Sequence, residues 1–229
     1  MRRSEINAAI DRAIRFFEES RFPLPPFAFW TPEEWRAKGP ECDAIRDTQI
    51  GWDVTDFGSG DFAGTGRTIF TLRNGAARDP RYAKSYAHKA MCLAEGQRSP
   101  VHLHKSKMED IINHGGGNVL IKFWRAAGDD YALSEDPVDV VVDGVNRRLA
   151  AGETVRLTPG ESVCVTPLTY HQFWAEEGAG LTLSVEVSSV CDDHRDNFWL
   201  ESGDRFPSID EDEPARHVLC GEYPPAPKG

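Results

Sequence analysis

The 229-residue chain has no apolar run near the roughly 18 residues that a membrane-spanning helix needs. It is also short of positive charge, because 26 lysines and arginines stand against 37 aspartates and glutamates, a formal net charge of −11. Nucleic acids and anionic membrane surfaces are bound by basic protein surfaces. We therefore expect no nucleic-acid partner and no membrane partner.

The chain shows neither a secretory signal nor a disulfide framework. Its N-terminus reads "MRRSEINAAIDRAIRFF" and lacks the continuous apolar core and small-residue cleavage site of a secretory signal. The five cysteines are an odd number, are widely spaced and include no Cys-x-x-Cys pair. Such usage is typical of free thiols in a reducing cytosol, and we predict a cytoplasmic protein.

The first part of the chain is expected to be helical. Ile6 and Ile10 belong to an apolar pattern with spacings of three and four, for which Ser4 can serve as the N-cap. A second short helix is expected after Thr31, with Pro32 in its first position.

From about residue 50 the pattern changes to short apolar runs separated by Gly, Pro or Asn at roughly ten-residue spacing, which is typical of an all-β sandwich or barrel. One hairpin is expected about Asp143 and Gly144. We predict one domain with a helical arm over residues 1–48, a barrel over 49–190 and a wrapping C-terminal segment over 191–229.

Two histidines stand close together in the run "VHLHKSKMED". On a strand, residues two apart share a face, so His102 and His104 would lie about 7 Å apart and point the same way. Two imidazoles so placed can converge on one metal ion, although an exposed strand can carry such a pair without function.

The surrounding spacing resembles the first signature of the cupin superfamily. It reads Gly96, five residues, His102, one residue, His104, four residues, Glu109, six residues and Gly116. This resemblance implies a jelly-roll barrel, the double-stranded β-helix of the cupins, in which the two histidines and Glu109 bind a metal.

A second cupin signature begins at Gly160 and places His171 at the expected offset of eleven residues. Here the match is imperfect: Pro167 is one position late, Leu168 replaces a glycine, and Ala175 stands where asparagine is frequent. The turn is therefore expected to differ locally while His171 remains the fourth metal ligand.

Most of the chain, from about residue 5 to 223, is similar to the D-lyxose isomerases, a cupin branch of aldose–ketose isomerases. The runs that carry the resemblance are "IGWDVTDFG", "TIFTLRNG", "HLHKSKMEDIINHGGGN", "YHQFWAEEGAG" and "EVSSVCDDHRDN". The family implies a divalent metal, usually manganese, and interconversion of D-lyxose with D-xylulose and often of D-mannose with D-fructose. Cupins use N-terminal arms across a two-fold interface, and the apolar Phe27, Phe29 and Trp30 predict a homodimer.

Three imidazoles and one carboxylate leave two positions open on a six-coordinate ion, which suits Mn²⁺, Fe²⁺, Co²⁺ or Ni²⁺, with Zn²⁺ also possible. Isomerisation also needs a base. Glu186 lies amid apolar alternation and is the first candidate, the alternative being a glutamate at the barrel edge that pairs with an arginine. Glu211 is the second candidate, and its alternative is a solvated acidic run.

Three basic residues are further candidates. Lys107 stands between two expected ligands and could stabilise an enediolate or carry a proton, unless it is an exposed turn lysine. Lys89 would share a strand face with apolar residues and could reach a sugar hydroxyl, and Arg216 is a weaker candidate of the same kind.

Two other functions remain open for such a chain. A cupin dioxygenase uses the same set of three histidines and one glutamate, and a non-catalytic cupin could bind a sugar as a sensor or store. A lysine and a carboxylate base favour the isomerase, because oxygen chemistry needs neither.

Overall fold

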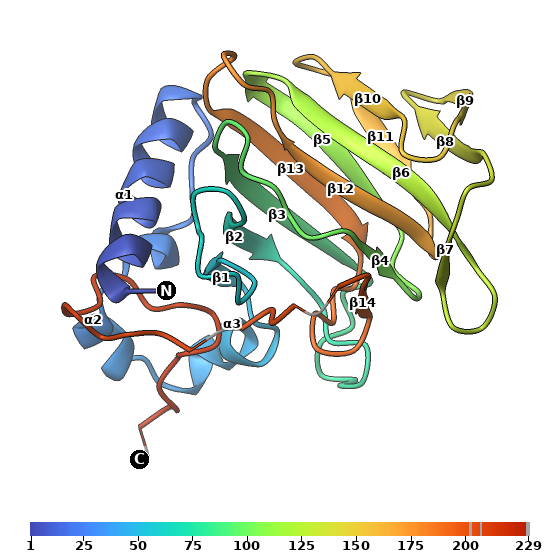
Figure 1. Ribbon diagram of the computed structural model, residues 1–229. Coiled ribbons are helices and arrows are strands. Elements are labelled where there is room, and N and C mark those ends of the chain that lie inside the picture. Colours follow the sequence, from blue (N-terminus) through green and yellow to red (C-terminus); the bar gives the residue numbers. More distant parts are fainter. Residues whose placement is uncertain (202, 207, 228–229) are drawn as a thin grey trace.

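The computed structural model describes residues 1–201, 203–206 and 208–227. Helix α1 lies beside a curved β-sheet, and a second sheet lies beyond the first (Figure 1). The helices are α1 (Arg3–Glu19), α2 (Pro32–Arg36) and α3 (Asp43–Asp47), with the 3₁₀ turns η1 (Pro26–Phe29) and η2 (Pro40–Cys42). The strands are β1 (Gly51–Thr55), β2 (Arg67–Arg73), β3 (Tyr86–Leu93), β4 (His102–His104), β5 (Glu109–Gly116), β6 (Val119–Ala127), β7 (Ala132–Ser134), β8 (Val138–Val142), β9 (Val145–Leu149), β10 (Thr154–Leu157), β11 (Ser162–Val165), β12 (Thr169–Ala175), β13 (Thr182–Ser189) and β14 (Asn197–Trp199).

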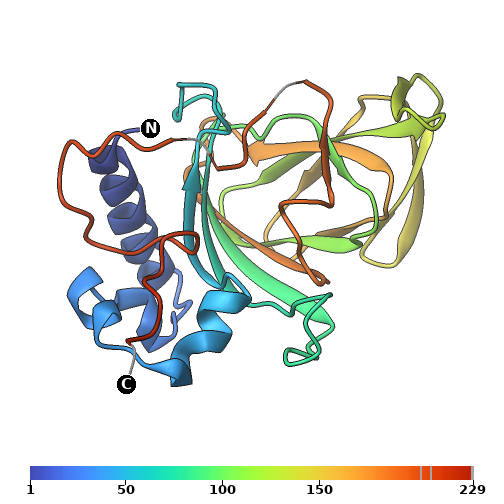
Figure 2. The same ribbon diagram turned by 90° about the horizontal axis from the view of Figure 1, so that it is seen from below.

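The strands form two antiparallel sheets that curve around a common interior (Figure 2). The larger sheet has the order β1-β2-β3-β13-β5-β11-β8-β9, and the smaller has the order β10-β6-β12-β4-β14, with β7 pairing with β6. Neighbours in the sheets are mostly distant in sequence, as in a jelly roll. The expected all-β barrel with an N-terminal helical arm is confirmed.

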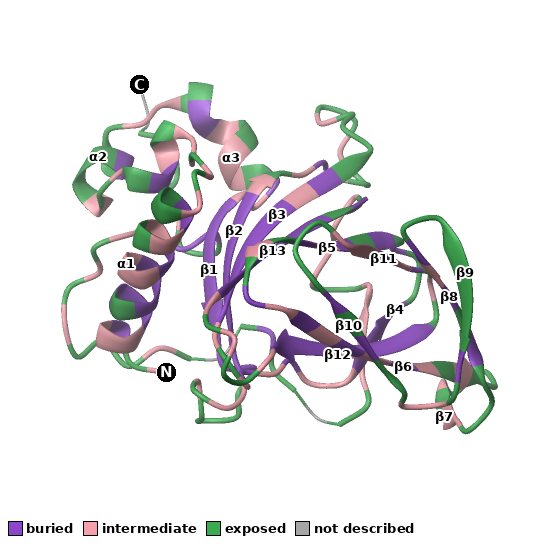
Figure 3. Ribbon diagram, turned by 90° about the horizontal axis from the view of Figure 1, so that it is seen from above, coloured by how far each residue is buried: buried purple, intermediate pink, exposed green. Residues whose placement is uncertain are grey.

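The main core fills the space between the two sheets. Side chains alternate along a strand, and every second residue of β6 and β8 is buried, whereas β12 and β13 are buried along most of their length (Figure 3). The cluster includes residues of both sheets: Ile69, Met91, Leu93, Ile111, Val119, Ile121, Phe123, Val138, Val140, Val142, Leu149, Val155, Leu157, Val163, Val165, Phe173 and Ala175.

Helix α1 covers the outer face of the larger sheet with its apolar side, which is buried in Figure 3. Ile10 and Phe17 are buried in a second cluster with Trp52 and Phe70, and the Phe17 ring stacks on Trp52 with centroids 6.4 Å apart. The predicted helical pattern is therefore confirmed, and its apolar stripe holds the arm to the barrel.

The expected role of Ser4 is wrong. The helix begins at Arg3, and Arg2 occupies the N-cap position. The Ser4 hydroxyl instead donates to Asp212 Oδ2 at 2.6 Å, because the C-terminal segment runs past the start of α1. Because Asp212 lies so far from Ser4 in sequence, no local pattern could have predicted this hydrogen bond.

The second helix begins as predicted. Thr31 Oγ1 accepts from the Glu34 amide at 3.2 Å, and Glu34 Oε2 accepts from the Thr31 amide at 2.7 Å. Of the apolar residues that suggested a dimer, Phe27 packs on Phe70 of its own chain, whereas 48% of Phe29 is exposed. The homodimer stays a prediction.

The hairpin between β8 and β9 turns at Asp143 and Gly144, as predicted, with φ values of +48° and +79°. Residues after 191 add strand β14, which pairs with β4, before the chain passes α1. No helix among the described residues is both long and apolar enough to cross a membrane.

We expect Ile10→Ala to lower the free energy of unfolding by about 2–5 kcal/mol, because it leaves a cavity between α1 and the sheet. Chemical denaturation monitored by circular dichroism measures the change. The matched control is Glu18→Ala on the exposed side of the same helix, which should stay within about 0.5 kcal/mol of the native protein. Equal stability of both variants would contradict the described docking of α1.

Candidate active site

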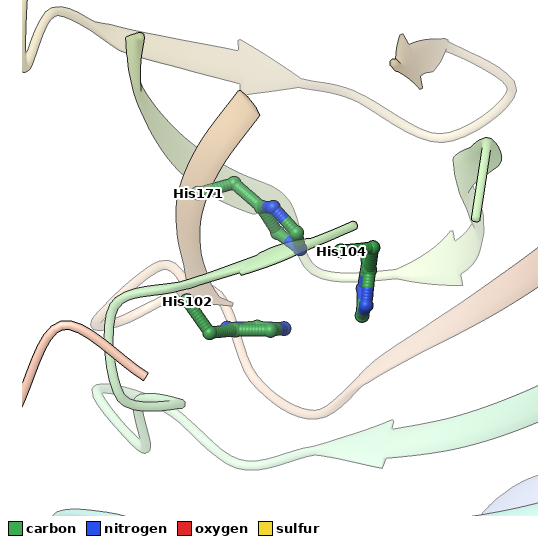
Figure 4. A group of neighbouring side chains, drawn as sticks. All are labelled: His102, His104 and His171. Carbon is green, nitrogen blue, oxygen red and sulfur yellow. The ribbon is translucent and has the colours of Figure 1, made fainter. Parts of the chain in front are cut away.

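Three histidines meet inside the barrel. His102 and His104 occupy the first and last positions of β4, and His171 on β12 pairs directly with His102. Each residue offers a nitrogen that lies within 4.8 Å of the other two, and all three side chains are buried. Figure 4 shows the rings converging on one point, so the predicted histidine cluster is confirmed as a group that could hold a metal ion.

Backbone carbonyls orient two of these rings. His102 Nδ1 lies 2.9 Å from the Pro100 carbonyl oxygen, and His171 Nδ1 lies 3.1 Å from the Thr169 carbonyl oxygen. Because a carbonyl only accepts, each Nδ1 carries the proton and each Nε2 keeps a free lone pair. Among the described residues, the buried His171 Nε2 has no hydrogen-bond partner.

Burial favours the neutral form of the histidines. Burial, together with the neighbouring His171 and His104, lowers the pKa of His102 well below its ordinary value. Burial also lowers the pKa of His104, and the Lys107 ammonium acts in the same direction. Neutral imidazole is the form that binds metals.

The turn before β12 contains a non-glycine residue, Leu168, with a positive φ angle. Leu168, which stands where cupins often have glycine, adopts a left-handed conformation with φ of +62°. Its amide donates to the His104 carbonyl at 2.8 Å, which ties β12 to the end of β4. The departure from the cupin pattern therefore leaves the position of His171 intact.

Glu109, the first residue of β5, faces the histidines. Its Oε1 lies 3.0 Å from His171 Nε2 and 3.4 Å from His104 Nε2, and its Oε2 accepts from Lys107 Nζ at 2.6 Å. Burial alone would raise the pKa of Glu109, but Lys107 and His104 outweigh it and hold the pKa well below its ordinary value. The carboxylate is ionised beside the three nitrogens.

Glu186 on β13 is the second buried carboxylate. Its Oε1 accepts from Lys107 Nζ at 2.9 Å and from Ser188 Oγ at 2.9 Å, and Lys89 Nζ lies 3.6 Å away. Burial opposes its charge, yet the two lysines lower the pKa of Glu186 below its ordinary value. Lys107 thus bridges Glu109 and Glu186, and burial of its side chain shows that it is no exposed turn lysine.

Lys89 connects Glu186 to a second group of charges. Its Nζ lies 2.9 Å from Cys191 Sγ and 3.8 Å from Asp193 Oδ2, and Arg205 Nη2 lies 3.4 Å from the same Asp193 oxygen. Burial raises the pKa of Cys191 to about 12, with Asp193 adding to the effect, so this cysteine is a neutral thiol.

A cavity joins these groups and is lined by both sheets and by the segment after β13. Its lining includes four basic and three acidic side chains, and Lys89, Lys107, Glu109 and Glu186 are among them. The lining residues are Phe57, Arg67, Ile69, Lys89, Met91, Ser99, His102, His104, Lys107, Glu109, His171, Phe173, Glu186, Asp193, Asn197, Trp199 and Arg205.

Two predicted site residues lie elsewhere. Glu211 accepts from Arg3 of α1, with Oε1 2.6 Å from Nη2, and does not line the cavity. Arg216 is exposed and pairs with Asp11 of α1 at 2.6 Å. Both belong to the C-terminal segment that packs on the helical arm, so neither is placed to act on a substrate in the cavity.

Sequence reasoning missed Asp193, Trp199 and Arg205. Asp193 lies in "EVSSVCDDHRDN", where the family resemblance could have drawn attention to it. The Trp199 ring lies beside His102, with centroids 4.9 Å apart, because β14 pairs with β4. Arg205 comes from an irregular segment. Neither position has a periodic pattern that would have revealed it.

The fold and the site together define a cupin-type barrel with a buried histidine centre. The L-ribose isomerase of Cellulomonas parahominis, solved with L-ribose, has a similar fold with a TM-score of 0.59 and 17% identity, covering 91% of this chain and 98% of that one. The L-ribose isomerase of Acinetobacter sp. DL28 is similar at a TM-score of 0.59 and 15% identity, covering 89% and 94%.

The D-lyxose isomerase family model matches residues 1–223. The D-lyxose/D-mannose isomerase of Escherichia coli O157:H7 is 46% identical over 97% of this chain and 98% of the relative. The corresponding isomerase of Serratia proteamaculans is 45% identical over the same shares. The chain therefore belongs to the D-lyxose isomerase family and is an aldose–ketose isomerase.

The ion pairs of Asp193 generate a pH-dependent prediction. Burial alone would raise the pKa of Asp193, but Lys89 and Arg205 hold it well below its ordinary value. The carboxylate therefore stabilises the fold fully above the unfolded aspartate pKa of about 3.9, and this contribution is lost as the pH falls from there toward the folded pKa.

We expect Asp193→Asn to lower the free energy of unfolding by about 3 kcal/mol at neutral pH, because it leaves buried cations with fewer partners. The difference from the native protein should shrink below about pH 4. Urea unfolding at a series of pH values measures it, with the neighbouring Asp192→Asn as the control. A difference that grew as the pH fell would contradict the ion-pair assignment.

Proposed function

We propose that this chain interconverts D-lyxose with D-xylulose, and D-mannose with D-fructose, in the histidine-lined cavity. The observation that carries the proposal is the bridge made by Lys107. Its ammonium group contacts the ionised carboxylate of Glu109, which faces the histidines, and the ionised carboxylate of Glu186. Aldose–ketose isomerisation needs a base that moves a proton between adjacent carbons, and an ionised carboxylate beside the histidine cluster can act as that base. The names of the two bacterial relatives support the choice of sugars.

We propose that His102, His104, His171 and Glu109 hold a divalent metal, most reasonably Mn²⁺. The fit rests on this chain's own atoms: the Nε2 atoms of His102 and His171 carry no proton, and Glu109 Oε1 lies close to Nε2 of His171 and of His104. Three nitrogen donors and one carboxylate suit Mn²⁺ and also Fe²⁺, Co²⁺, Ni²⁺ or Zn²⁺. When bound, such an ion supplies Lewis acidity that polarises the sugar carbonyl.

Glu186 is the proposed base. Its depressed pKa keeps it ionised at neutral pH, so it can accept the proton from C2 of the open-chain aldose. The C2–H electrons form the C1–C2 double bond of an enediolate. Glu186 then returns a proton to C1 while the hydroxyl proton of C2 ends on O1, which gives the ketose with every atom conserved.

The basic residues around the cavity favour the charge that develops during this transfer. Lys107 and Lys89 both lie close to Glu186. With Arg67 and Arg205, the cavity lining has four basic side chains and three acidic ones. Fixed positive charge in a site that excludes water stabilises an anionic intermediate more than a neutral sugar. Lys107 is therefore proposed to assist catalysis and Lys89 to contact the substrate.

His171→Ala should lower metal affinity by more than about 100-fold, because loss of a direct ligand exceeds the effect of losing a supporting residue. Turnover should fall by orders of magnitude with it. Metal content after dialysis, measured by mass spectrometry, and ketose formation from D-lyxose check both effects. The exposed His114→Ala is the control. Stoichiometric metal and full turnover in His171→Ala would disprove the four-ligand assignment.

Glu186→Gln should keep the metal and the KM while kcat falls by roughly 10²–10⁴-fold, because the amide cannot accept the proton. In deuterium oxide the native protein should place deuterium in the ketose at C1, since the proton is shared with the base and exchanges with water. NMR of the product reads this out, and oxygen-free buffer should leave the rate unchanged.

The exposed Glu177→Gln is the matched control and should behave as the native protein does. A Glu186→Gln variant of near-normal kcat would discard the proposed base. Dependence on oxygen would favour the dioxygenase instead.

A further inference from the structure

Strand β13 presents three polar side chains to the barrel interior. Ser184, Glu186 and Ser188 are two residues apart, so they share one face, and all three are buried. Polar side chains inside a barrel are costly unless they are hydrogen-bonded. Among the described residues, Ser184 Oγ has no hydrogen-bond partner, whereas Ser188 Oγ contacts Glu186.

The two oxygens of Glu186 have different surroundings. Oε1 accepts from Ser188 Oγ at 2.9 Å and from Lys107 Nζ at 2.9 Å, and Lys89 Nζ lies 3.6 Å from it. In the described part of the chain no hydrogen bond reaches Oε2. The carboxylate is thus fixed through one oxygen, while the other oxygen is free of hydrogen bonds to the described residues in a side chain that lines the cavity.

We propose that Ser188 is a positioning residue for the reaction: its hydroxyl anchors Glu186 Oε1 and so makes Oε2 the oxygen that takes the proton from the sugar. The inference rests on the proposed role of Glu186 as the base. A carboxylate held only by the two lysines could rotate about its last bond, because ammonium groups impose little direction. The serine hydroxyl on the same strand supplies the missing constraint.

The Ser188 hydroxyl has two acceptors and one proton. Its Oγ lies 2.9 Å from Glu186 Oε1 and also 2.9 Å from the Ser189 carbonyl oxygen. A hydrogen bond to an ionised acceptor is stronger than one to a neutral carbonyl, so the hydroxyl donates to Glu186 while the carboxylate is charged. Once Oε2 has taken a proton, Oε1 is a weaker acceptor, and the hydroxyl can turn to Ser189 without leaving its proton unpaired.

Ser188 acts through Glu186 and does not touch the sugar, since it is absent from the residues that line the cavity. Its loss should therefore change the chemical step and leave binding unchanged. This separates it from Lys89 and Lys107, which line the cavity themselves and whose replacement would alter both.

The test compares kcat and KM for D-lyxose, with bound metal and thermal unfolding, in Ser188→Ala, Ser188→Thr and Ser184→Ala. Ser188→Ala should lower kcat roughly 10-fold, the loss of one hydrogen bond to a charged group, with KM and metal content unchanged. Ser188→Thr keeps the hydroxyl and should recover most of the rate. Ser184→Ala removes a buried hydroxyl from the same face of β13 and should match the native protein.

A native kcat in Ser188→Ala would overturn the proposal, and so would equal losses in Ser188→Ala and Ser184→Ala, which would indicate general disturbance of the strand. Failure of the threonine variant to recover the rate while remaining folded would also overturn it. Glu186→Gln in the same assay distinguishes failure of the positioning role of Ser188 from failure of Glu186 as the base. If that variant loses turnover and Ser188→Ala does not, only the positioning role fails; if Glu186→Gln keeps turnover, the proposed base fails first.

Discussion

The buried ammonium group of Lys107 is the interaction on which the rest of the site depends. It donates to Glu109 at 2.6 Å and to Glu186 at 2.9 Å, so two buried carboxylates can both stay ionised within reach of each other. Without that cation, burial and mutual repulsion would favour protonation of one of them. A single lysine between β4 and β5 thus keeps both carboxylates ionised, as the proposed roles of Glu109 and Glu186 require.

The two sheets of the barrel divide the chemistry between them. The smaller sheet carries the three histidines on β4 and β12, and the larger sheet carries Lys89 on β3, Glu109 on β5 and Glu186 on β13. Nitrogen donors and charged groups therefore approach the cavity from opposite walls. The apolar core between the sheets fixes their separation, which makes the geometry of the site a consequence of barrel packing.

Local patterns predicted the parts of the site that are local. The His-x-His spacing marked His102 and His104, and alternation marked Glu186 as buried, whereas Glu109 and His171 were expected from the resemblance to the cupin signatures. Nothing local could show that Asp193 and Arg205 reach the same cavity, because they come from an irregular segment whose position depends on tertiary packing. The same tertiary packing keeps Glu211 away from the cavity, because Glu211 binds Arg3 of α1 instead. Sequence spacing describes strands well, whereas the C-terminal segment is placed by contacts about 200 residues apart.

The central claim is that one carboxylate faces the metal position while the other faces the reacting carbon. A crystal structure of Glu186→Gln with Mn²⁺ and D-fructose tests it most directly. The account predicts one ion held by the three histidines and Glu109 through Oε1, with residue 186 beside C1 and C2 of the open-chain sugar. An ion bound elsewhere, or a sugar whose C1 and C2 lie away from residue 186, would contradict the account.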